Sequence, residues 1–358
     1  MIKMISLKTK LCTLLNIEHP IIQAGMAGGA TTPELIANVS NAGGLGTLGA
    51  AYMKPEDIKK AIHDIRKLTA KPFSVNLFCV ENSDKPGDEE KNIVKNELLR
   101  IGRDLGVSEL DIKFNAADYF DEQFQVLIDE KVPIISTAFG LLPEEKVKQA
   151  KENGIIITSM ITTVEEAILA EENGVDIIIV QGSDAGGHIG TFDLSKHKNG
   201  ADVGTFSLVP QVADNVKIPV VAAGGANDGR SLAAALALGA SGVQIGTRFL
   251  SSEEAGIHKA YKQKLFDSKE DDTVITKVFS GRPARGILNT FIEEFSMDPL
   301  PYPYQNTATK SIRGAAAKND DGEYMSLWAG QNLRPVVKEQ GAAEIIEEIM
   351  DGARKILE

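Results

Sequence analysis

Short apolar runs recur along the whole chain, and each is followed by a stretch with helical periodicity. We predict eight strands, at residues 20–25, 45–50, 73–78, 133–139, 155–160, 176–182, 219–225 and 242–247. They are mostly rich in Ile and Val and bounded by Gly or Pro, which is typical of parallel strands buried on both faces. Eight strand–helix repeats predict an α/β fold, the (β/α)8 TIM barrel. A doubly wound sheet is the alternative, but it more often stops at five or six strands.

Two segments interrupt this rhythm. Residues 81–119 form a charge-rich and then helical excursion after the third strand. The excursion leaves from the strand's C-terminal end, where barrel active sites lie, so a lid and a solvated decoration are both open interpretations. Beyond Asp272 come a Pro-Tyr cluster at residues 298–304 and an amphipathic helix at 341–357. We therefore predict a barrel over residues 1–272, excursion included, and a C-terminal helical extension over 273–358 packed on it.

Composition narrows the classes of partner. The chain has 358 residues and a formal net charge of −12, so it lacks the basic footprint that nucleic acids require. No apolar run reaches the roughly 20 residues needed to span a bilayer, and the first ten residues show no signal-peptide pattern. The two cysteines, Cys12 and Cys79, lack metal-ligand spacing. We expect a cytoplasmic protein that binds neither nucleic acid nor membrane.

The segment Val180-Gln-Gly-Ser-Asp-Ala-Gly-Gly-His-Ile-Gly190 is the most informative in the chain. It follows a buried strand, and its glycines allow a ligand to approach the backbone closely. His188 adds a side chain whose ordinary pKa lies near neutrality. A Gly-rich surface loop with a solvated histidine is the alternative interpretation.

In a barrel, the C-terminal ends of all strands meet at one mouth. The Gly224-Gly225 loop after the seventh strand and the Gly246-Thr247 turn after the eighth predict a phosphate site. Amide side chains at Asn76, Gln181 and Gln244 suit the polar edge of a heterocycle, although each one could instead cap a backbone group. The five histidines are scattered, which predicts no metal site, and no Ser or Cys is placed as an activated nucleophile. The chemistry is therefore expected to belong to a bound cofactor.

Five motifs of the chain resemble the nitronate monooxygenase family, in the right order and spacing. They are Pro20-Ile-Ile-Gln-Ala-Gly-Met26, Val75-Asn-Leu-Phe78, Gln181-Gly-Ser-Asp-Ala-Gly-Gly-His188, Gln244-Ile-Gly-Thr-Arg-Phe249 and Ser280-Gly-Arg-Pro-Ala-Arg-Gly286. The resemblance implies a barrel that binds FMN non-covalently and gives His188 the role of the active-site histidine. The implied FMN-binding residues are Gly25, Met26, Asn76, Gln181, Gly186, Gly187, Ala223, Gly224, Gly225, Gln244, Ile245, Gly246 and Thr247.

The resemblance implies oxidation of alkyl nitronates, such as propionate-3-nitronate, by dioxygen to carbonyl products and nitrite. The related FMN-dependent enoyl-acyl-carrier-protein reductases share the Gly-Gly-His-Ile-Gly segment, so NADH-dependent reduction of an enoyl thioester is the alternative. An inosine-monophosphate-dehydrogenase type of reaction would need a Cys where the chain has Gly182-Ser183-Asp184, and a non-catalytic flavin module would leave His188 unexplained. The expected partners are a small-molecule substrate and dioxygen, with a homodimer left open.

Tyr302 and Lys310 are candidate substrate-binding residues in the extension. If residues 302–310 were helical, both could face one side. We expect one of them to reach the barrel mouth, where an ammonium or a phenol could hold an anionic nitronate. The alternative is a Tyr that packs the extension and a solvated Lys.

Overall fold

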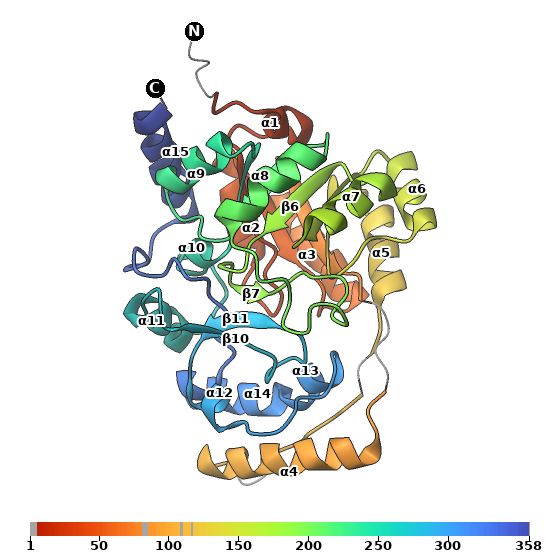
Figure 1. Cartoon of the computed structure of the whole chain (residues 1–358), viewed down its shortest axis with the longest axis vertical. Coiled ribbons are helices and arrows are strands. Elements are labelled where there is room, and N and C mark those ends of the chain that lie inside the picture. Colours follow the sequence, from red (N-terminus) through yellow and green to blue (C-terminus); the bar gives the residue numbers. More distant parts are fainter. Residues whose placement is uncertain (1–5, 81–84, 108–109, 116, 358) are drawn as a thin grey trace.

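The eight predicted strands close into a parallel barrel in a computed structural model that describes residues 6–80, 85–107, 110–115 and 117–357 (Figure 1). The strands are β1 (Ile21–Gln23), β2 (Gly46–Gly49), β3 (Phe73–Phe78), β4 (Ile134–Ala138), β5 (Ile156–Ile161), β6 (Ile177–Gln181), β8 (Val220–Ala223) and β9 (Gly242–Ile245). They are ordered β1-β9-β8-β6-β5-β4-β3-β2. A bridge between Ile22 and Leu45 joins the two ends, and the Gln23 amide donates to the Leu45 carbonyl over 2.9 Å. The predicted (β/α)8 fold is confirmed.

Helices connect the strands on the outside of the barrel. They are α2 (Pro33–Asn41), α3 (Pro55–Leu68), α5 (Phe120–Asp129), α6 (Glu144–Glu152), α7 (Val164–Asn173), α8 (Thr205–Asn215), α9 (Gly229–Ala237) and the short α10 (Thr247–Leu250). The last helix, α15 (Ala342–Leu357), packs against α9 and α2 and buries Ile345, Ile346 and Ile349. The chain therefore returns to the barrel at its C-terminus, and α15 completes the outer ring.

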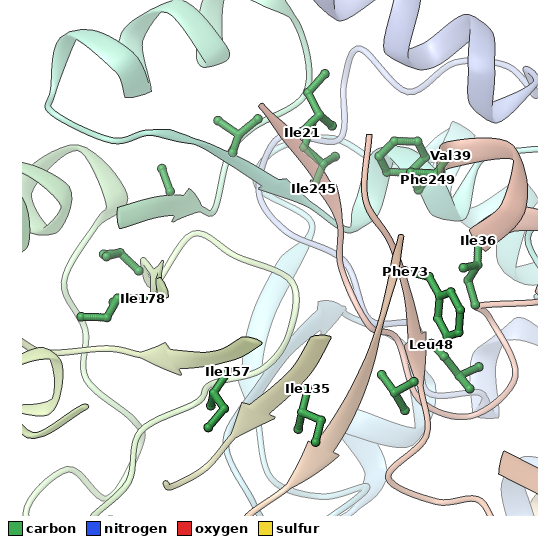
Figure 2. Close-up of a cluster of buried hydrophobic side chains, with 14 of the residues drawn as sticks. Ile21, Ile36, Val39, Leu48, Phe73, Ile135, Ile157, Ile178, Ile245 and Phe249 are labelled. Atoms are coloured by element: carbon green, nitrogen blue, oxygen red, sulfur yellow. The ribbon is translucent and has the colours of Figure 1, made fainter. Parts of the chain in front are cut away.

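Apolar side chains form two cores, one in the space between the strands and the helices and the other in the N-terminal half of the barrel interior. Ile135, Ile157, Ile178 and Ile245 point outward from four strands into the first of these cores (Figure 2). Helix α1 (Lys10–Leu15) closes the N-terminal end, where its leucines join a cluster of inward strand residues. Inside the barrel, space for a ligand therefore lies toward the C-terminal ends of the strands, as is usual in this fold.

The extension and the excursion form a separate hydrophobic core, the second core, on the side of the barrel mouth. It includes α11 (Lys259–Asp267), α12 (Thr290–Glu294), α13 (Tyr304–Ala308), α14 (Lys310–Lys318), the 3₁₀ helix η1 (Gly322–Tyr324) and, from the excursion, α4 (Asp88–Asp104). Helix α4 lies beside α12 and α14 in Figure 1, and Leu98 and Ile101 are buried in the same cluster as Phe291. The excursion thus packs against the extension. Its residues 81–84, 108–109 and 116 lie outside the described residues.

A small antiparallel sheet joins the extension to the barrel. Its strands are β10 (Thr273–Thr276), β11 (Ala284–Ile287) and the two-residue β7 (Gly187–His188), in the order β10-β11-β7. Ala284 pairs with His188, and Arg285 pairs with Gly187. A domain boundary at residue 272 remains a prediction, because residues on both sides of it contribute to this sheet and to the second core. Among the described residues, no helix is both long and apolar enough to cross a bilayer.

Candidate active site

A cavity of about 400 Å³ lies between the barrel mouth and the extension. This volume is within the usual range for small-molecule and cofactor sites. The expected residues on its wall are Gly25, Met26, Asn76, Gln181, Gly186, Gly187, His188, Ala223, Gly224, Gly225, Gln244, Gly246 and Thr247. Ile245 is the exception. Its side chain is 2 % exposed and belongs to the outer core, because alternate residues of a strand face opposite sides.

The Gly-rich loop after β6 is fixed at both ends. Gln181 Nε2 donates to the His188 carbonyl over 2.9 Å, and the Gly190 amide donates to Gln181 Oε1 over 2.7 Å. The strand pairing of β7 with β11 secures the same loop from the other side. The amide of Gln181 is therefore used in holding the loop, which is the capping role that the sequence left open, while the residue also lines the cavity.

His188 lies on the cavity wall among aromatic rings. Its ring centroid is 5.4 Å from that of Trp328, 5.6 Å from Phe139 and 6.2 Å from Phe78. Its Nε2 is 2.8 Å from the hydroxyl oxygen of Ser280. Burial, and next the charges of two nearby arginines, lower the pKa of His188 from 6.5 to about 3. The imidazole is therefore neutral at physiological pH, with one ring nitrogen that carries a lone pair.

The Gly224–Gly225 loop adopts a tight turn of the kind that a phosphate cradle needs. Gly224 and Gly225 have φ values of +124° and +63°, which favour glycine. A Cβ on Gly225 would stand 2.7 Å from a carboxylate oxygen of Asp184, so this loop is closed against its own neighbours on that side. Asn332 Nδ2 donates to the Gly225 carbonyl over 2.6 Å, and the Gly330 amide donates to Thr247 Oγ1 over 3.0 Å. The extension therefore supports both loops.

Two amide side chains remain available to a ligand. Asn76 Nδ2 donates to Ser136 Oγ over 3.2 Å, so the side-chain carbonyl oxygen of Asn76 can still accept a hydrogen bond from a ligand. Gln244 lines the cavity and has no hydrogen-bond partner within the part of the chain that the structure describes. Both are almost fully buried at strand ends. They retain the chemistry that the sequence indicated for a heterocycle.

Buried guanidinium groups surround His188, and the sequence analysis did not single them out. Arg282 is 6 % exposed and lies 4.1 Å over the ring of Phe139. Arg313, from α14, lines the cavity and donates to the carbonyl of Asn306 over 2.6 Å. The Nε atoms of both arginines are buried without a hydrogen-bond partner among the described residues. Of these two arginines, only Arg313 lines the cavity, so its guanidinium is the one that a ligand in the cavity can meet.

The charge of Arg313 is not balanced by a carboxylate. Among the described residues, none forms a salt bridge with Arg313, and the acidic group that acts on its pKa is the phenol of Tyr52. Burial raises the pKa of Tyr52 to about 12, so that phenol is neutral at physiological pH. The wall next to His188 therefore carries a positive charge from Arg313.

The two substrate-binding candidates lie in different environments. Tyr302 precedes α13, and its ring is 6.1 Å from that of Phe139, with a hydrogen bond to Tyr52. Phe139 and Tyr52 both line the cavity, which places Tyr302 at its edge. Lys310 is exposed at the first position of α14 and does not line the cavity. Helix α13 ends at Ala308, so residues 302–310 do not form one helix, and the cation of α14 that lines the cavity is Arg313.

Comparison with known proteins identifies the class of this site. The nitronate monooxygenase family matches residues 8–352, nearly the whole chain. The chain belongs to this family. A probable nitronate monooxygenase of Staphylococcus saprophyticus is 43 % identical over 355 residues, 98 % of this chain and 99 % of the relative. One from Staphylococcus aureus strain MSSA476 has the same identity and coverage.

Solved structures of two enzyme types resemble this nitronate monooxygenase family member. A nitroalkane oxidase from Streptomyces ansochromogenes is 37 % identical, with a TM-score of 0.88, over 96 % of this chain and 98 % of that one. FabK from Thermotoga maritima is 34 % identical, with a TM-score of 0.78, over 98 % and 97 %. The barrel, the loops and the family together establish an oxidoreductase.

Proposed function

We propose that this protein is an FMN-dependent nitronate monooxygenase that oxidises alkyl nitronates, such as propionate-3-nitronate, with dioxygen to carbonyl products and nitrite. The observation that carries the proposal is the unbalanced guanidinium of Arg313 on the same wall as a neutral His188. A nitronate is an anion, and a buried cation without a carboxylate partner favours an anionic ligand. Family membership supports the reaction type.

The residues on the cavity wall fit FMN. The loops at Gly224–Gly225 and Gly246–Thr247 would hold its phosphate with their backbone N–H groups, because both loops line the cavity and their glycines carry no side chain. Asn76 and Gln244 would bond the polar edge of the ring system. A Cβ on Gly187 would meet no protein atom within 4 Å, so this part of the wall is open to a flat ligand. Bound FMN would supply the electron transfer between nitronate and dioxygen.

The side chains around the reacting group have separate roles. Arg313 would orient the anionic nitro group of the substrate. His188 would take the α-proton from a neutral nitroalkane or donate a hydrogen bond to the nitro oxygens. The rings of Phe78, Phe139 and Trp328 would exclude water from this region and strengthen its electrostatic interactions.

The visible spectrum and the flavin content of the purified protein test the cofactor first. Turnover of propionate-3-nitronate, followed as nitrite release and oxygen uptake, then tests the reaction. A yellow protein that releases nitrite supports the proposal. A protein that contains flavin but releases no nitrite from any alkyl nitronate would refute the proposed reaction, while the assignment of the cofactor would still hold.

Enoyl-thioester reduction is the second candidate, because the FabK structure matches almost the whole chain. This activity requires NADH to reduce the flavin. Rapid anaerobic bleaching of the flavin by NADH, followed by reoxidation with an enoyl thioester, would favour the reductase. Slow bleaching combined with nitronate turnover would favour the oxidase. A homodimer and a cytoplasmic location belong to the same proposal.

A further inference from the structure

Ser280 is the only described side chain that forms a hydrogen bond with the ring of His188. It is 1 % exposed and lies in the loop that leads into β11. The Oγ–Nε2 distance is 2.8 Å, and Nδ1 has no hydrogen-bond partner among the described residues. Since His188 lines the cavity, Nδ1 is the ring nitrogen left for a substrate.

The surroundings of the Ser280 hydroxyl decide how this hydrogen bond is directed. The hydroxyl donates to the carbonyl of Arg282 over 3.2 Å, and the Arg282 amide donates to the hydroxyl oxygen over 3.2 Å. A serine hydroxyl has one proton and two acceptor sites. If its proton is given to the Arg282 carbonyl, the oxygen presents only a lone pair to His188. If the proton were given to Nε2, that buried carbonyl would lose its donor, which is costly.

We propose that Ser280 is a positioning residue that holds His188 as the Nε2–H tautomer, so that Nδ1 carries the lone pair facing the cavity. The hydrogen bond at one ring nitrogen sets which nitrogen is protonated. This proposal rests on the proposed function and decides between the two roles given there to His188. With the lone pair on Nδ1, the imidazole is a base for a neutral nitroalkane. The α C–H bond breaks, the proton passes to Nδ1, and the electron pair moves into the nitro group to form the nitronate.

The same geometry predicts that Ser280 matters for one class of substrate only. A neutral nitroalkane must lose its α-proton, whereas a preformed nitronate has already lost it. Partners that orient a histidine typically contribute about 10- to 100-fold to its function. We therefore expect a loss of that size for nitroethane and little change for ethyl nitronate when the Ser280 hydroxyl is removed.

The first experiment reads the tautomer directly and needs no turnover. The flavin-loaded protein labelled with 15N-histidine is examined by NMR at neutral pH, and His188→Gln identifies the signal. We expect a protonated Nε2 and an unprotonated Nδ1 at His188. A protonated Nδ1 would overturn the proposal, whether or not the protein oxidises nitronates.

The second experiment compares Ser280→Ala, Ser280→Thr and the control Ser252→Ala. Ser252 is also fully buried and bonds a backbone carbonyl, that of Phe249 over 2.8 Å, but it forms no hydrogen bond with His188. We expect Ser280→Ala to lower kcat/KM for nitroethane about 10- to 100-fold with ethyl nitronate near the wild-type value. Ser280→Thr, which keeps the hydroxyl, should recover nitroethane turnover, and Ser252→Ala should change neither.

An equal loss with both substrates in Ser280→Ala would show that the serine only supports the fold, and would overturn the proposal. A thermal melt and the flavin spectrum of each variant separate loss of folding from loss of positioning. If the wild-type protein oxidises neither substrate, the proposed function fails, and the NMR measurement still decides the tautomer.

Discussion

Replacing Arg313 by Met is the sharpest test of the anionic substrate. The change keeps most of the aliphatic stem and removes the guanidinium that lines the cavity beside His188. The lost hydrogen bonds within the protein are those to the carbonyl and the side-chain oxygen of Asn306, which lies on the neighbouring helix. The Nε atom gives up nothing in the free protein, because it has no described partner. The effect should therefore appear mainly in substrate binding.

The size of the effect follows from the kind of interaction. A hydrogen bond to a charged group contributes about 1.5–3 kcal/mol. At about 1.4 kcal/mol for each factor of ten, KM for a nitronate should rise about 10- to 150-fold. The assay is nitrite release against nitronate concentration, with flavin content and melting temperature measured in parallel.

Lys310→Met is the matched control on the same helix. It also removes one positive charge, but from an exposed side chain outside the cavity. We expect an unchanged KM for this variant. Equal effects of the two changes would mean that only the overall charge of α14 matters, and an unchanged KM in Arg313→Met would refute the assignment of the anion site.

Three further predictions concern His188 and the cofactor loops. His188→Ala should retain the flavin spectrum and lose about 10²–10⁴-fold in nitroalkane turnover, and an unaltered rate would remove His188 from the mechanism. Gly246→Val should lower FMN content without unfolding the protein, because its Cβ would meet Ala24 and Met26 only at 3.7 and 3.8 Å. The control Gly204→Ala should retain full flavin. Full flavin in Gly246→Val as well would mean that the phosphate lies elsewhere. In the folded protein His188 is protonated only near pH 3, whereas in the unfolded chain it is protonated below 6.5. Acidification between these values should therefore lower the free energy of unfolding by about 1.4 kcal/mol per pH unit. Urea titrations that give His188→Ala the same dependence of the free energy of unfolding on pH would contradict the lowered pKa.

The barrel could be predicted because its strands carry local signals. Each predicted strand range overlaps one observed strand, and Thr32 and Thr163 cap α2 and α7 with their hydroxyls as their sequence contexts indicate. The place of α15 could not be predicted in this way. Its apolar face shows that it packs on something, but only the tertiary structure shows that the partners are α9 and α2. The same holds for α4, whose buried residues meet the distant segment around Phe291.

The site also contains residues that the sequence could predict and residues that it could not. Residues at strand ends were found because a barrel brings all of them to one mouth, whatever their separation in sequence. Gln181 was identified as part of the site, but its hydrogen bonds to its own loop could not be read from its position. Arg313 was missed because it lies in the extension, where no strand register fixes which side chains turn toward the barrel. Its position three residues after Lys310 was the available signal, since residues at that spacing share a helical face.

The segment from Ser280 to Gly286 shows why the extension belongs to the active site. Its serine contacts the His188 ring, and Arg282 donates to the carbonyl of Thr191 beyond the loop. Arg285 donates to the carbonyl of Ser183 at the start of the same loop, over 2.8 Å. The Ile189 amide donates to the carbonyl of Pro283, so side-chain and backbone bonds act together along the segment. The Gly-rich loop gains a defined geometry from these contacts, because every one of them is made to β11 or to the loop that leads into it, and β11 is itself paired with β10. The barrel provides the cavity, and the extension fixes the orientation of the histidine within it.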